Sequence, residues 1–597
     1  MSLSHVLLIA SILACFLSGS SCKKSNKLTF SNEIVEVPDN DPVPQYDQIE
    51  LSTDKAIYKP GEQVNISIAG IDNIQGVKVR YKHQNEILSE ENINALQWGW
   101  QPPDVDFTGY LVEVINTDNN ETTICGTIGV DVSSSWTKFP RYGFLSKFPA
   151  LQATSVNEVI DNLNRFHING LQFYDWHYKH HQPLPFVGGQ PAEEWKDIIN
   201  RDIHLSTVQN YITVAHNRGM KAMFYNLLYG AWGDAADDGV NDDWYIFKDV
   251  NGLNKDSHEL PKPPFVSDIF LTNPANEEWQ SYLLNEHDKV YNSLDFDGFH
   301  IDQLGDRGSR YLADGKGINL SATYAPFIEA CKNRQPDKYL VMNAVNQYGQ
   351  SNITFSPVDF LYTEVWSPND TYNDLSNIIK NNYEFSQGKK NTVLAAYMNY
   401  DLADDKGFFH QPSVLTTNAV IFAFGGAHLE LGEHMLGKEY FPNNNLEVTE
   451  ELNKRLIDYY DFLVAYQNLL RDKGQFNTVK LESLSNQSNV LNWPASAGSI
   501  ACIAKLVEDR QVIHLINFNE LAQLDWRDNN GEHKTPRIIE DLKLELSSGK
   551  TVKSVWCASP DVAGGTSIQL NHIQEEHTVR FKLPKLEYWS MIVLEFN

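Results

Sequence analysis

Two acidic residues, Asp302 and Glu364, each stand at the end of an apolar stretch, in "FDGFHIDQLGD" and "LYTEVW". Two carboxyl groups that meet in one pocket can cleave a glycosidic bond. One attacks the sugar or activates water, and the other, protonated, supplies a proton to the departing oxygen. A lone acid at a strand end is more often a turn, N-cap or salt-bridged residue. The chemistry therefore depends on a fold that brings the two together.

Both stretches alternate in a way that aims their acids at a common interior. Successive side chains of a strand point to opposite faces, so every second residue shares a face. The polar positions then face inward (His300 and Asp302; Tyr362 and Glu364), and the apolar positions face the surrounding helices (Phe299 and Ile301; Leu361 and Val365). Two carboxylates on different strands are thus predicted to converge at one mouth.

Strand-like and helix-like stretches alternate eight times between residues 135 and 481, which predicts a (β/α)8 TIM barrel. In this fold the active groups lie where the strands end. Helical patterns such as "SVNEVIDNLNRFHI" separate most of the strands, and the longer gap after the third strand should form a loop over the active face. The strand candidates are Tyr142–Phe148, Gly170–Trp176, Ala222–Leu228, Gly298–Leu304, Tyr339–Val345, Phe360–Trp366, Val393–Asn399 and Ile421–Leu429.

The segments on either side of this region read as β-domains. Residues 47–134 alternate in short runs broken by Gly, Pro, Asn and Asp, which predicts an immunoglobulin-like β-sandwich. Residues 482–597 return to that style and predict a C-terminal antiparallel β-sandwich, with "SIACIAKLVEDRQVIHLINF" and "TVRFKLPKLEYWSMIVLEF" as strand pairs. The predicted fold class is therefore multidomain, with a central TIM barrel flanked by two β-sandwiches.

The first residues predict export. An apolar run from Val6 to Leu17 has the length of a signal-peptide core, and small residues then lead to Cys22. This arrangement resembles a bacterial lipoprotein signal, in which the cysteine is lipidated. Cys15 offers a competing cleavage frame. We expect residues 1–22 to be the signal peptide, 23–46 a linker, and any membrane attachment to be through a lipid on Cys22, with secretion as the alternative.

Composition excludes some partners. The 597 residues carry 77 acidic and 48 basic side chains, a formal net charge of −29. Such a charge repels nucleic acid and anionic lipid, so neither is an expected partner. The aromatic content of 12% suits a neutral ligand with apolar faces, such as a sugar, although aromatic residues mostly build cores.

Residues near the predicted strand ends are candidates for sugar binding. Aromatic faces stack on the C–H faces of sugar rings, while Asp, Asn and His bind hydroxyls. About half of these rings would instead be core packing, with Trp176 and Tyr225 the first to be assigned so. The candidates are Asp175, Trp176, His177, Tyr178, Asn226, Tyr229, Trp232, His300, Tyr362, Trp366, Asn399 and Glu433.

No cofactor or metal is expected. His177, His180 and His181 lack the HExxH spacing, and "DAADDGVNDD" lacks the alternating ligands of an EF-hand. After the leader, the four cysteines are scattered without a CxxC pair, which favours buried free thiols over zinc or disulfides.

The chain resembles glycoside hydrolase family 66, the dextranases and cycloisomaltooligosaccharide glucanotransferases. The resemblance rests on "INGLQFYDWHYKHHQPL", "FDGFHIDQLGD", "LYTEVW" and "GAHLELGEHMLGKEYFP" and covers about residues 47–597. It implies a retaining enzyme acting on α-1,6-glucan (dextran) and isomaltooligosaccharides, with Asp302 as nucleophile and Glu364 as acid/base. Retention implies carboxyl groups about 5–5.5 Å apart, and an acid at neutral pH needs a raised pKa on Glu364, from Trp366 and the Asp302 charge.

Three functions remain open. Cyclising members of the family typically carry a sugar-binding module inserted in the barrel, and the gaps here cannot hold one, so linear endo-hydrolysis of dextran is favoured. The alternatives are a transglycosylase or cyclising glucanotransferase that uses the same pair, and a surface glycan-binding lipoprotein that has lost catalysis. The presence of both acids speaks against the last.

Overall fold

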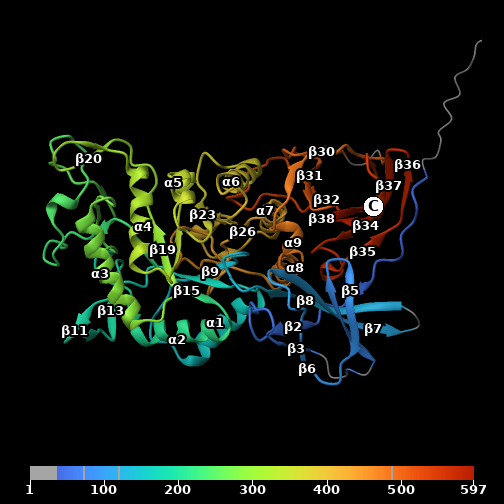
Figure 1. Ribbon diagram of the computed structural model, residues 1–597, viewed down its shortest axis with the longest axis horizontal. Helices are drawn as coiled ribbons and strands as arrows, with labels where there is room; N and C mark the ends of the chain where they lie inside the picture. Colours follow the sequence, from blue (N-terminus) through green and yellow to red (C-terminus); the bar gives the residue numbers. More distant parts are fainter. Residues whose placement is uncertain (1–35, 71–73, 75, 119–120, 486–488) are drawn as a thin grey trace, which may run out of the picture. The chain divides into compact units, whose positions relative to one another are not determined.

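The computed structural model describes residues 36–597 except 71–73, 75, 119–120 and 486–488 (Figure 1). The predicted signal peptide (1–22), Cys22 and the linker up to residue 35 lie outside the described residues. Within the described residues, no helix combines the length and the apolar composition needed to cross a bilayer. The cysteines at 125, 331, 502 and 557 are free thiols; the last three are buried, as predicted, whereas Cys125 is half-buried.

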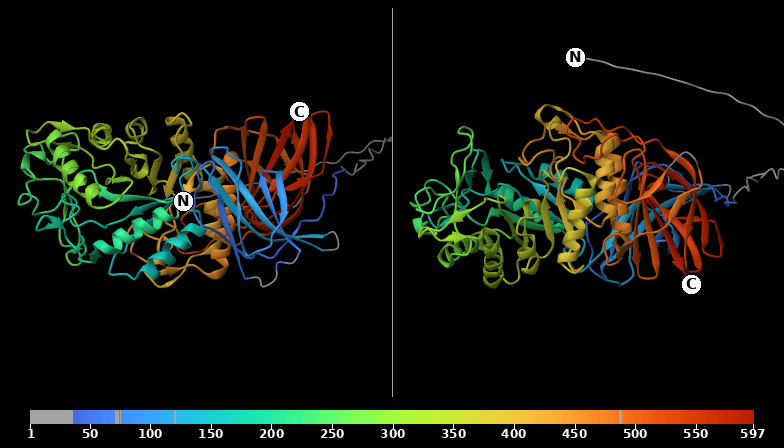
Figure 2. Two further views of the ribbon diagram at one scale, coloured as in Figure 1. Left: turned by 60° about the horizontal axis from the view of Figure 1, so that its bottom comes forward. Right: turned by 90° about the horizontal axis from the view of Figure 1, so that it is seen from above.

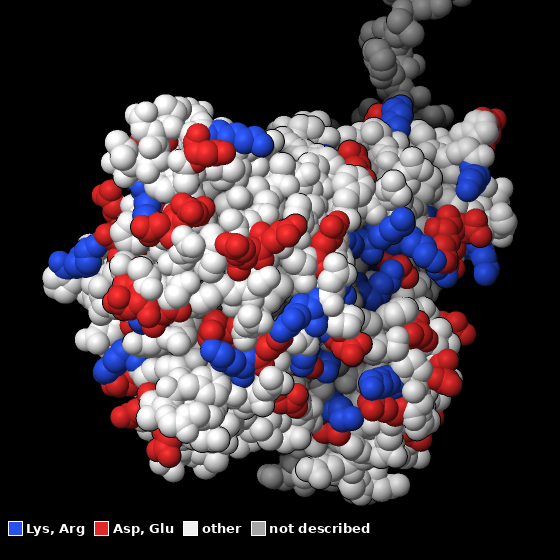
Figure 3. Space-filling view, turned by 60° about the vertical axis from the view of Figure 1, so that its left-hand side comes forward, with Lys and Arg blue, Asp and Glu red and all other residues white. Residues whose placement is uncertain are grey.

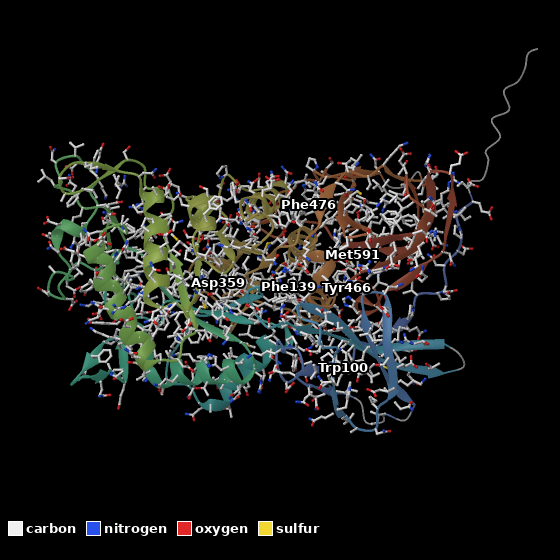
Figure 4. The ribbon with its side chains drawn as sticks, in the orientation of Figure 1. Trp100, Phe139, Asp359, Tyr466, Phe476 and Met591 are labelled. Carbon is white, nitrogen blue, oxygen red and sulfur yellow. The ribbon has the colours of Figure 1, made fainter. Side chains whose placement is uncertain are left out.

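The first strands form two sheets around one shared core, as the alternating pattern predicts. One sheet has the order β1-β8-β7-β4-β5 and the other β2-β3-β6. Apolar residues of both sheets fill the core, where Trp100 stacks on Tyr81 with ring centroids 4.4 Å apart (Figure 4). The strands are β1 Gln45–Tyr46, β2 Glu50–Thr53, β3 Val64–Ala69, β4 Val77–His83, β5 Glu86–Asn92, β6 Gln97–Trp100, β7 Thr108–Asp118 and β8 Glu121–Val132.

The central region contains the predicted parallel strands, arranged as two sheets. A five-stranded sheet has the order β22-β19-β15-β10-β9, and a three-stranded sheet has the order β23-β24-β26. Single parallel bridges, Asn343↔Tyr362 and Phe144↔Gly432, connect strand ends of the two sheets. The strands are β9 Tyr142–Leu145, β10 Gly170–Phe173, β15 Lys221–Leu227, β19 Gly298–Asp302, β22 Tyr339–Met342, β23 Leu361–Glu364, β24 Thr392–Ala395 and β26 Ala427–His428. In the described residues the regular pairing of these eight strands thus stops at two seams, which the single bridges span, whereas the sequence predicts one continuous closed sheet.

The prediction of the eighth strand, Ile421–Leu429, was wrong over the first half of that range. Residues 421–423 end helix α7 (Gln411–Ala423), and only Ala427–His428 forms β26. Every residue of α7 from Pro412 to Ala423 is buried. A helix buried on all sides carries no polar stripe, so its sequence shows no helical period and reads as an apolar strand.

Helices connect most of the parallel strands and follow local signals in the sequence. Val156, Ile160 and Leu163 give α1 one buried face at helical spacing. The Asn276 side chain accepts from two backbone N–H groups at the start of α3, and Thr371 forms a capping box at the start of α6. The helices are α1 Ala153–Arg165, α2 Leu205–Asn217, α3 Glu277–Ser293, α4 Tyr324–Arg334, α5 Gln350–Phe355, α6 Tyr372–Phe385, α8 Glu450–Ala465 and α9 Gln467–Leu470.

Short strands occupy the connections beyond the ends of the parallel strands. The long connection after β15 contains β16, β17 and β18, and buried Asp256 beside β17 accepts hydrogen bonds from Arg307 and Arg310. These short strands are β11 Phe186–Val187, β12 Gln190–Pro191, β13 Glu194–Lys196, β14 Asp202–His204, β16 Gly230–Ala231, β17 Ser257–His258, β18 Ile269–Leu271, β20 Arg310–Tyr311, β21 Gly317–Ile318, β25 Gly407–Phe408 and β27 Leu446–Glu447.

The last strands form two further sheets. One has the order β28-β31-β32-β38-β34-β35, and the other β29-β33-β37-β36. β31 and β32 pair as predicted, but β37 and β38 lie in different sheets, because the chain crosses between sheets after Leu586. The strands are β28 Gln475–Asn477, β29 Leu481–Ser483, β30 Val490–Asn492, β31 Ile500–Val507, β32 Arg510–Asn517, β33 Ile539–Ser547, β34 Val552–Ala558, β35 Ile568–Leu570, β36 His572–Glu575, β37 Thr578–Leu586 and β38 Trp589–Phe596.

The N-terminal group of strands, in blue, and the C-terminal group, in red, lie side by side in both views of Figure 2. Lys82 donates to Thr566 Oγ1 at 3.0 Å and is paired with Glu113 in the same buried spot. Tyr466 (Figure 4), which follows α8, donates to the Gly565 carbonyl at 2.8 Å. The C-terminal sheets are thus attached by buried polar contacts both to the N-terminal strands and to the last helices.

Candidate active site

The two acids stand where predicted, at the carboxyl ends of two strands. Asp302 is the last residue of β19, and Glu364 is the last residue of β23. Phe299 and Ile301 pack in the apolar core, while His300 and Asp302 line a cavity, so the predicted alternation is confirmed for this strand. The strand end therefore directs the carboxylate into a hollow.

One side chain, Asn343 at the end of β22, joins the two carboxylates. Its Nδ2 donates to Asp302 Oδ1 at 2.8 Å and to Glu364 Oε2 at 2.9 Å. Its Oδ1 accepts from the Glu364 backbone N–H at 3.1 Å, which fixes the orientation of the amide. Because both carboxylate oxygens bond the same nitrogen, they lie less than about 6 Å apart, a spacing that places both beside one sugar ring.

Each acid also has its own tyrosine. Tyr225 on β15 donates its hydroxyl to Asp302 Oδ2 at 2.7 Å, and Tyr397 after β24 donates to Glu364 Oε1 at 2.8 Å. Both oxygens of each carboxylate are therefore held, so neither group can rotate without losing a hydrogen bond. Five different strands, β15, β19, β22, β23 and β24, contribute to this geometry.

The surroundings push the two acids toward different protonation states. Burial raises the pKa of Asp302, and the hydrogen bonds from Tyr225 and Asn343 oppose that rise. Burial, followed by the nearby Asp302 charge, raises the pKa of Glu364 to about 7. Two close carboxylates cannot both ionise cheaply. Only Glu364 therefore has a pKa raised by its partner's charge as well as by burial, which favours Glu364 over Asp302 as the site of the proton.

The cavity around the pair has a volume of about 670 Å³. Its lining includes aromatic residues, among them Tyr174, which stacks on Phe441 with ring centroids 4.2 Å apart. It also includes aliphatic residues such as Ile198, Leu260 and Ile269. A hollow of this size lined by both polar and apolar side chains matches the requirements of a sugar, whose ring has C–H faces and a polar rim.

Part of the predicted binding set lies on this cavity. Asp175, two residues after β10, adopts φ 48°, and burial raises its pKa to about 7, opposed by the Arg201 charge. The predicted residues that line the cavity are Asp175, His300, Asp302, Tyr362, Glu364 and Trp366. The alternation rule is sufficient to find the inward residues of β19 and β23.

The other predicted binding residues lie outside the cavity lining and contact protein groups. Trp176 donates to the Tyr225 carbonyl, Asn226 to the His180 carbonyl, and Tyr229 accepts from the Leu304 backbone N–H. Glu433 accepts from Ser146, and Asn399 donates to the Asp528 carbonyl. His177 is buried, while Tyr178 and Trp232 pack 5.9 Å apart.

Sequence reasoning missed the residues that hold the acids. Tyr225 was assigned to packing, and Asn343 and Tyr397 were not selected. Each stands on the inward face near a strand end, in "FYNLL", "VMNAV" and "YMNYD". The available signal was a polar residue on a strand adjacent to that of the acid, within two residues of the position opposite the acid.

A cluster of one histidine and two aspartates contains a lysine ammonium at the position where a metal ion could bind. His181, Asp234 and Asp238 lie close enough together to be metal ligands. Lys179 Nζ, however, lies 2.7 Å from both Asp234 and Asp238. A lysine ammonium thus supplies the positive charge that a metal ion would provide at this cluster.

Parallel strands that end in a half-buried pair of carboxyl groups with raised pKa, beside a sugar-sized cavity, define a glycoside-cleaving enzyme. Comparison with known proteins agrees with this class. Residues 53–593 match the model for glycosyl hydrolase family 66. The chain therefore belongs to glycosyl hydrolase family 66, which confirms the resemblance in the sequence.

Individual relatives cover most of the chain. A cycloisomaltooligosaccharide glucanotransferase of Niallia circulans is 26% identical over 702 aligned positions, covering 91% of this chain and 71% of that protein. A dextranase of Streptococcus salivarius is 23% identical, covering 87% of this chain and 72% of that protein. The crystal structure of a Paenibacillus sp. cycloisomaltooligosaccharide glucanotransferase with cycloisomaltoheptaose has a TM-score of 0.84 at 25% identity, covering 92% of this chain and 100% of that chain.

Replacing Asn343 by alanine is expected to lower kcat/KM by about 100-fold, because one lost donor loosens both carboxylates and typically costs that much. The amide lowers the pKa of both acids, so both pH limbs should move upward. Steady-state pH profiles measure this. Asn382→Ala is the control, since that buried asparagine contacts Thr363 on the same strand as Glu364 but not the acids. Unchanged limbs in Asn343→Ala would contradict the assigned role.

Proposed function

We propose that the protein is an endo-acting dextranase that hydrolyses α-1,6-glucosidic bonds of dextran to isomaltooligosaccharides with retention of configuration. The observation that carries the proposal is the Asn343 amide bonded to both Asp302 and Glu364. It supports a carboxyl spacing nearer the about 5–5.5 Å of retaining enzymes than the about 6.5–9.5 Å of inverting ones. The substrate follows from a dextranase and glucanotransferases among the relatives.

In the first step ionised Asp302 attacks the anomeric carbon from the face opposite the departing glucan. The C–O bond to the departing glucan breaks as Glu364 gives its proton to the leaving oxygen. The attack by Asp302 forms a β-linked glycosyl ester between this residue and the sugar. The hydrogen bonds from Tyr225 and Asn343 keep Asp302 charged and aimed until the attack. Protonated Glu364 is available at neutral pH because its pKa is about 7.

In the second step Glu364, now ionised, removes a proton from water. The water oxygen attacks the anomeric carbon, the ester bond to Asp302 breaks, and the α-configuration is restored. Tyr397 and Asn343 hold the ionised carboxylate in place during this step. Each protonation state of Glu364 is thus used once per turnover.

The architecture we propose is one closed (β/α)8 barrel over residues 135–481. It lies in the sequence between a β-domain over residues 47–134 and a second β-domain over residues 482–597. Two single bridges support closure: Asn343↔Tyr362 joins the residue after β22 to β23, and Phe144↔Gly432 joins β9 to the segment that follows β26. Cross-strand distances from amide-to-amide NMR contacts at these two seams would test closure, and absent contacts at either seam would refute it.

Hydrolysis is favoured over cyclisation by the connections between the strands. In the described residues the longest connection, from β15 to β19, holds only short strands, a turn of helix and α3. The inserted sugar-binding module expected of cyclising members has no counterpart there. Transglycosylation with the same acid pair is the second candidate, because the Niallia circulans relatives are glucanotransferases.

A panel of α-1,6-, α-1,4-, α-1,3- and β-linked glucans, with products followed by anomer-resolving NMR, tests the proposal. We expect cleavage of the α-1,6 polymer, with α-anomers released first and linear products dominant. Cyclic or lengthened isomaltosaccharides as main products would establish the transferase instead. Binding of dextran without any cleavage would establish a glycan-binding protein.

We also propose that the protein is exported and lipidated at Cys22 of a signal-like N-terminus. The support is the apolar run Val6–Leu17 followed by small residues. Metabolic labelling with a radioactive fatty acid measures lipidation. Label that persists in Cys22→Ala, or no label in the wild type, would overturn the assignment.

A further inference from the structure

A loop of the C-terminal domain, residues 518–538 between β32 and β33, is bonded to the chain just after the catalytic acid. Tyr372 N–H donates to the Leu524 carbonyl at 2.9 Å, and Trp526 N–H to the Asp370 carbonyl at 3.1 Å. The Trp526 indole adds a bond of 2.7 Å to the Asn369 carbonyl. This loop is therefore joined by backbone groups to the segment that follows β23.

The tip of the loop carries Arg527, which is 9% exposed. Its guanidinium lies 5.0 Å from the ring centre of Trp366, 5.2 Å from Tyr400 and 4.7 Å from Trp526. Its Nη2 donates to the Val365 carbonyl at 2.9 Å. A planar cation among three rings is held by cation–π attraction and needs its full planar shape to touch them all.

Two of the residues that Arg527 contacts, Val365 and Trp366, directly follow Glu364. The Val365 backbone is fixed on one side by its own N–H, which donates to the Ala395 carbonyl at 3.0 Å. Trp366 lines the cavity beside Glu364, and hydrogen bonding by its side chain lowers the pKa of that acid, whereas the sequence predicts that Trp366 raises it. A displacement of Arg527 would therefore be transmitted through Val365 and Trp366 to the adjacent proton donor, Glu364.

We propose that Arg527 is a positioning residue through which the C-terminal domain sets the geometry of the acid Glu364, an inference that rests on the proposed glycosidase function. Arg527 touches Trp366 and Val365 rather than the substrate. The C-terminal domain then completes the active site, and its loop contributes to the glycosylation step.

The loop is held firmly enough to present Arg527 in one place. Asp528 accepts from His410 Nδ1 at 2.9 Å and from the Glu532 and His533 backbone N–H groups at 2.7 and 3.2 Å. Asn399 contributes a backbone N–H to the Arg527 carbonyl at 2.8 Å and a side-chain N–H to the Asp528 carbonyl, also at 2.8 Å. This gives Asn399, predicted to bind sugar, a role in holding the loop.

The test compares two leaving groups on the same protein preparation. Dextran needs a proton on its departing oxygen, whereas the fluoride of an α-isomaltosyl fluoride departs with little help from an acid. The measured quantity is the ratio of kcat/KM for dextran to kcat/KM for the fluoride. kcat/KM reports steps through glycosylation, and the ratio does not depend on the fraction of protein that is folded.

We expect this ratio to fall by about tenfold or more in Arg527→Met, which removes the planar cation, and in Arg527→Lys, which keeps only the charge. The basic limb of the dextran pH profile should move upward, because a displaced Trp366 no longer lowers the pKa of Glu364. The control Arg510→Met, which removes a C-terminal-domain arginine paired with Glu595, should keep the wild-type ratio.

Ratios within about twofold of wild type in both Arg527 variants would overturn the inference. Failure of the proposed function is recognised separately with Glu364→Gln. If that variant also leaves the ratio unchanged, Glu364 is not the acid, and the proposed function fails whatever Arg527 does. If Glu364→Gln lowers the ratio and the Arg527 variants do not, only the positioning role is refuted.

Discussion

Replacing Asp302 by asparagine is expected to lower kcat/KM for dextran by about 10⁴-fold or more. An amide cannot form the glycosyl ester, and loss of a nucleophile that acts in concert with its partners has effects of this order. Tyr225 and Asn343 can still contact the new side chain, so the cavity should persist. Initial rates of reducing-end release from dextran measure the loss.

The matched control is Asp306→Asn, four residues along the same motif. Asp306 is exposed and, among the residues that the structure describes, accepts a hydrogen bond only from the Gly308 N–H in its own turn, at 2.8 Å, so this variant should retain wild-type activity. A smaller variant, Asp302→Ala, given α-isomaltosyl fluoride and azide, should yield the β-azide, because azide enters from the face that Asp302 vacates. Wild-type turnover in Asp302→Asn would contradict the assignment of Asp302 as the nucleophile.

Replacing Glu364 by glutamine is expected to lower kcat/KM for dextran by about 10²- to 10⁴-fold, the usual contribution of a general acid. The effect on α-isomaltosyl fluoride should be much smaller, because fluoride needs little protonation. Azide should then yield the α-azide, since it attacks the β-linked ester from the side where Glu364 normally delivers water. Glu384→Gln, on an exposed position of α6, is the control.

The pH profile carries the same assignment. The active form needs Asp302 ionised and Glu364 protonated, so activity should fall below the pKa of the first and above that of the second. Burial and the Asp302 charge raise the pKa of Glu364 to about 7, which predicts a basic limb of kcat/KM near pH 7. In Glu364→Gln that limb should vanish, and its persistence would assign it to another group.

The surface charge of an enzyme affects its association with the substrate more than the cleavage of the bond. The chain carries a net charge of −29, and Figure 3 shows acidic side chains interspersed with basic ones over one face. A neutral glucan feels no long-range force from such a surface. Rates on dextran should therefore reflect contacts inside the cavity.

Local patterns predicted the strands that matter because alternation is a property of the extended backbone. The apolar Phe299 and Ile301 had to be buried, which left His300 and Asp302 facing inward. The same pattern failed at residues 421–423, because a fully buried helix and a buried strand have the same apolar composition. It also paired β37 with β38, which the structure places in separate sheets.

The sequence by itself determined the two acids, the strand ends that bear them and, through its motifs, the family. Only the tertiary structure decided that Asn343 joins both carboxylates, that Tyr225 and Tyr397 hold one each, and that Arg527 reaches Val365 across 162 residues. A strand's facing depends on its immediate neighbours along the chain. A hydrogen bond between side chains of different strands depends on how distant segments pack, and no local pattern encodes that distance.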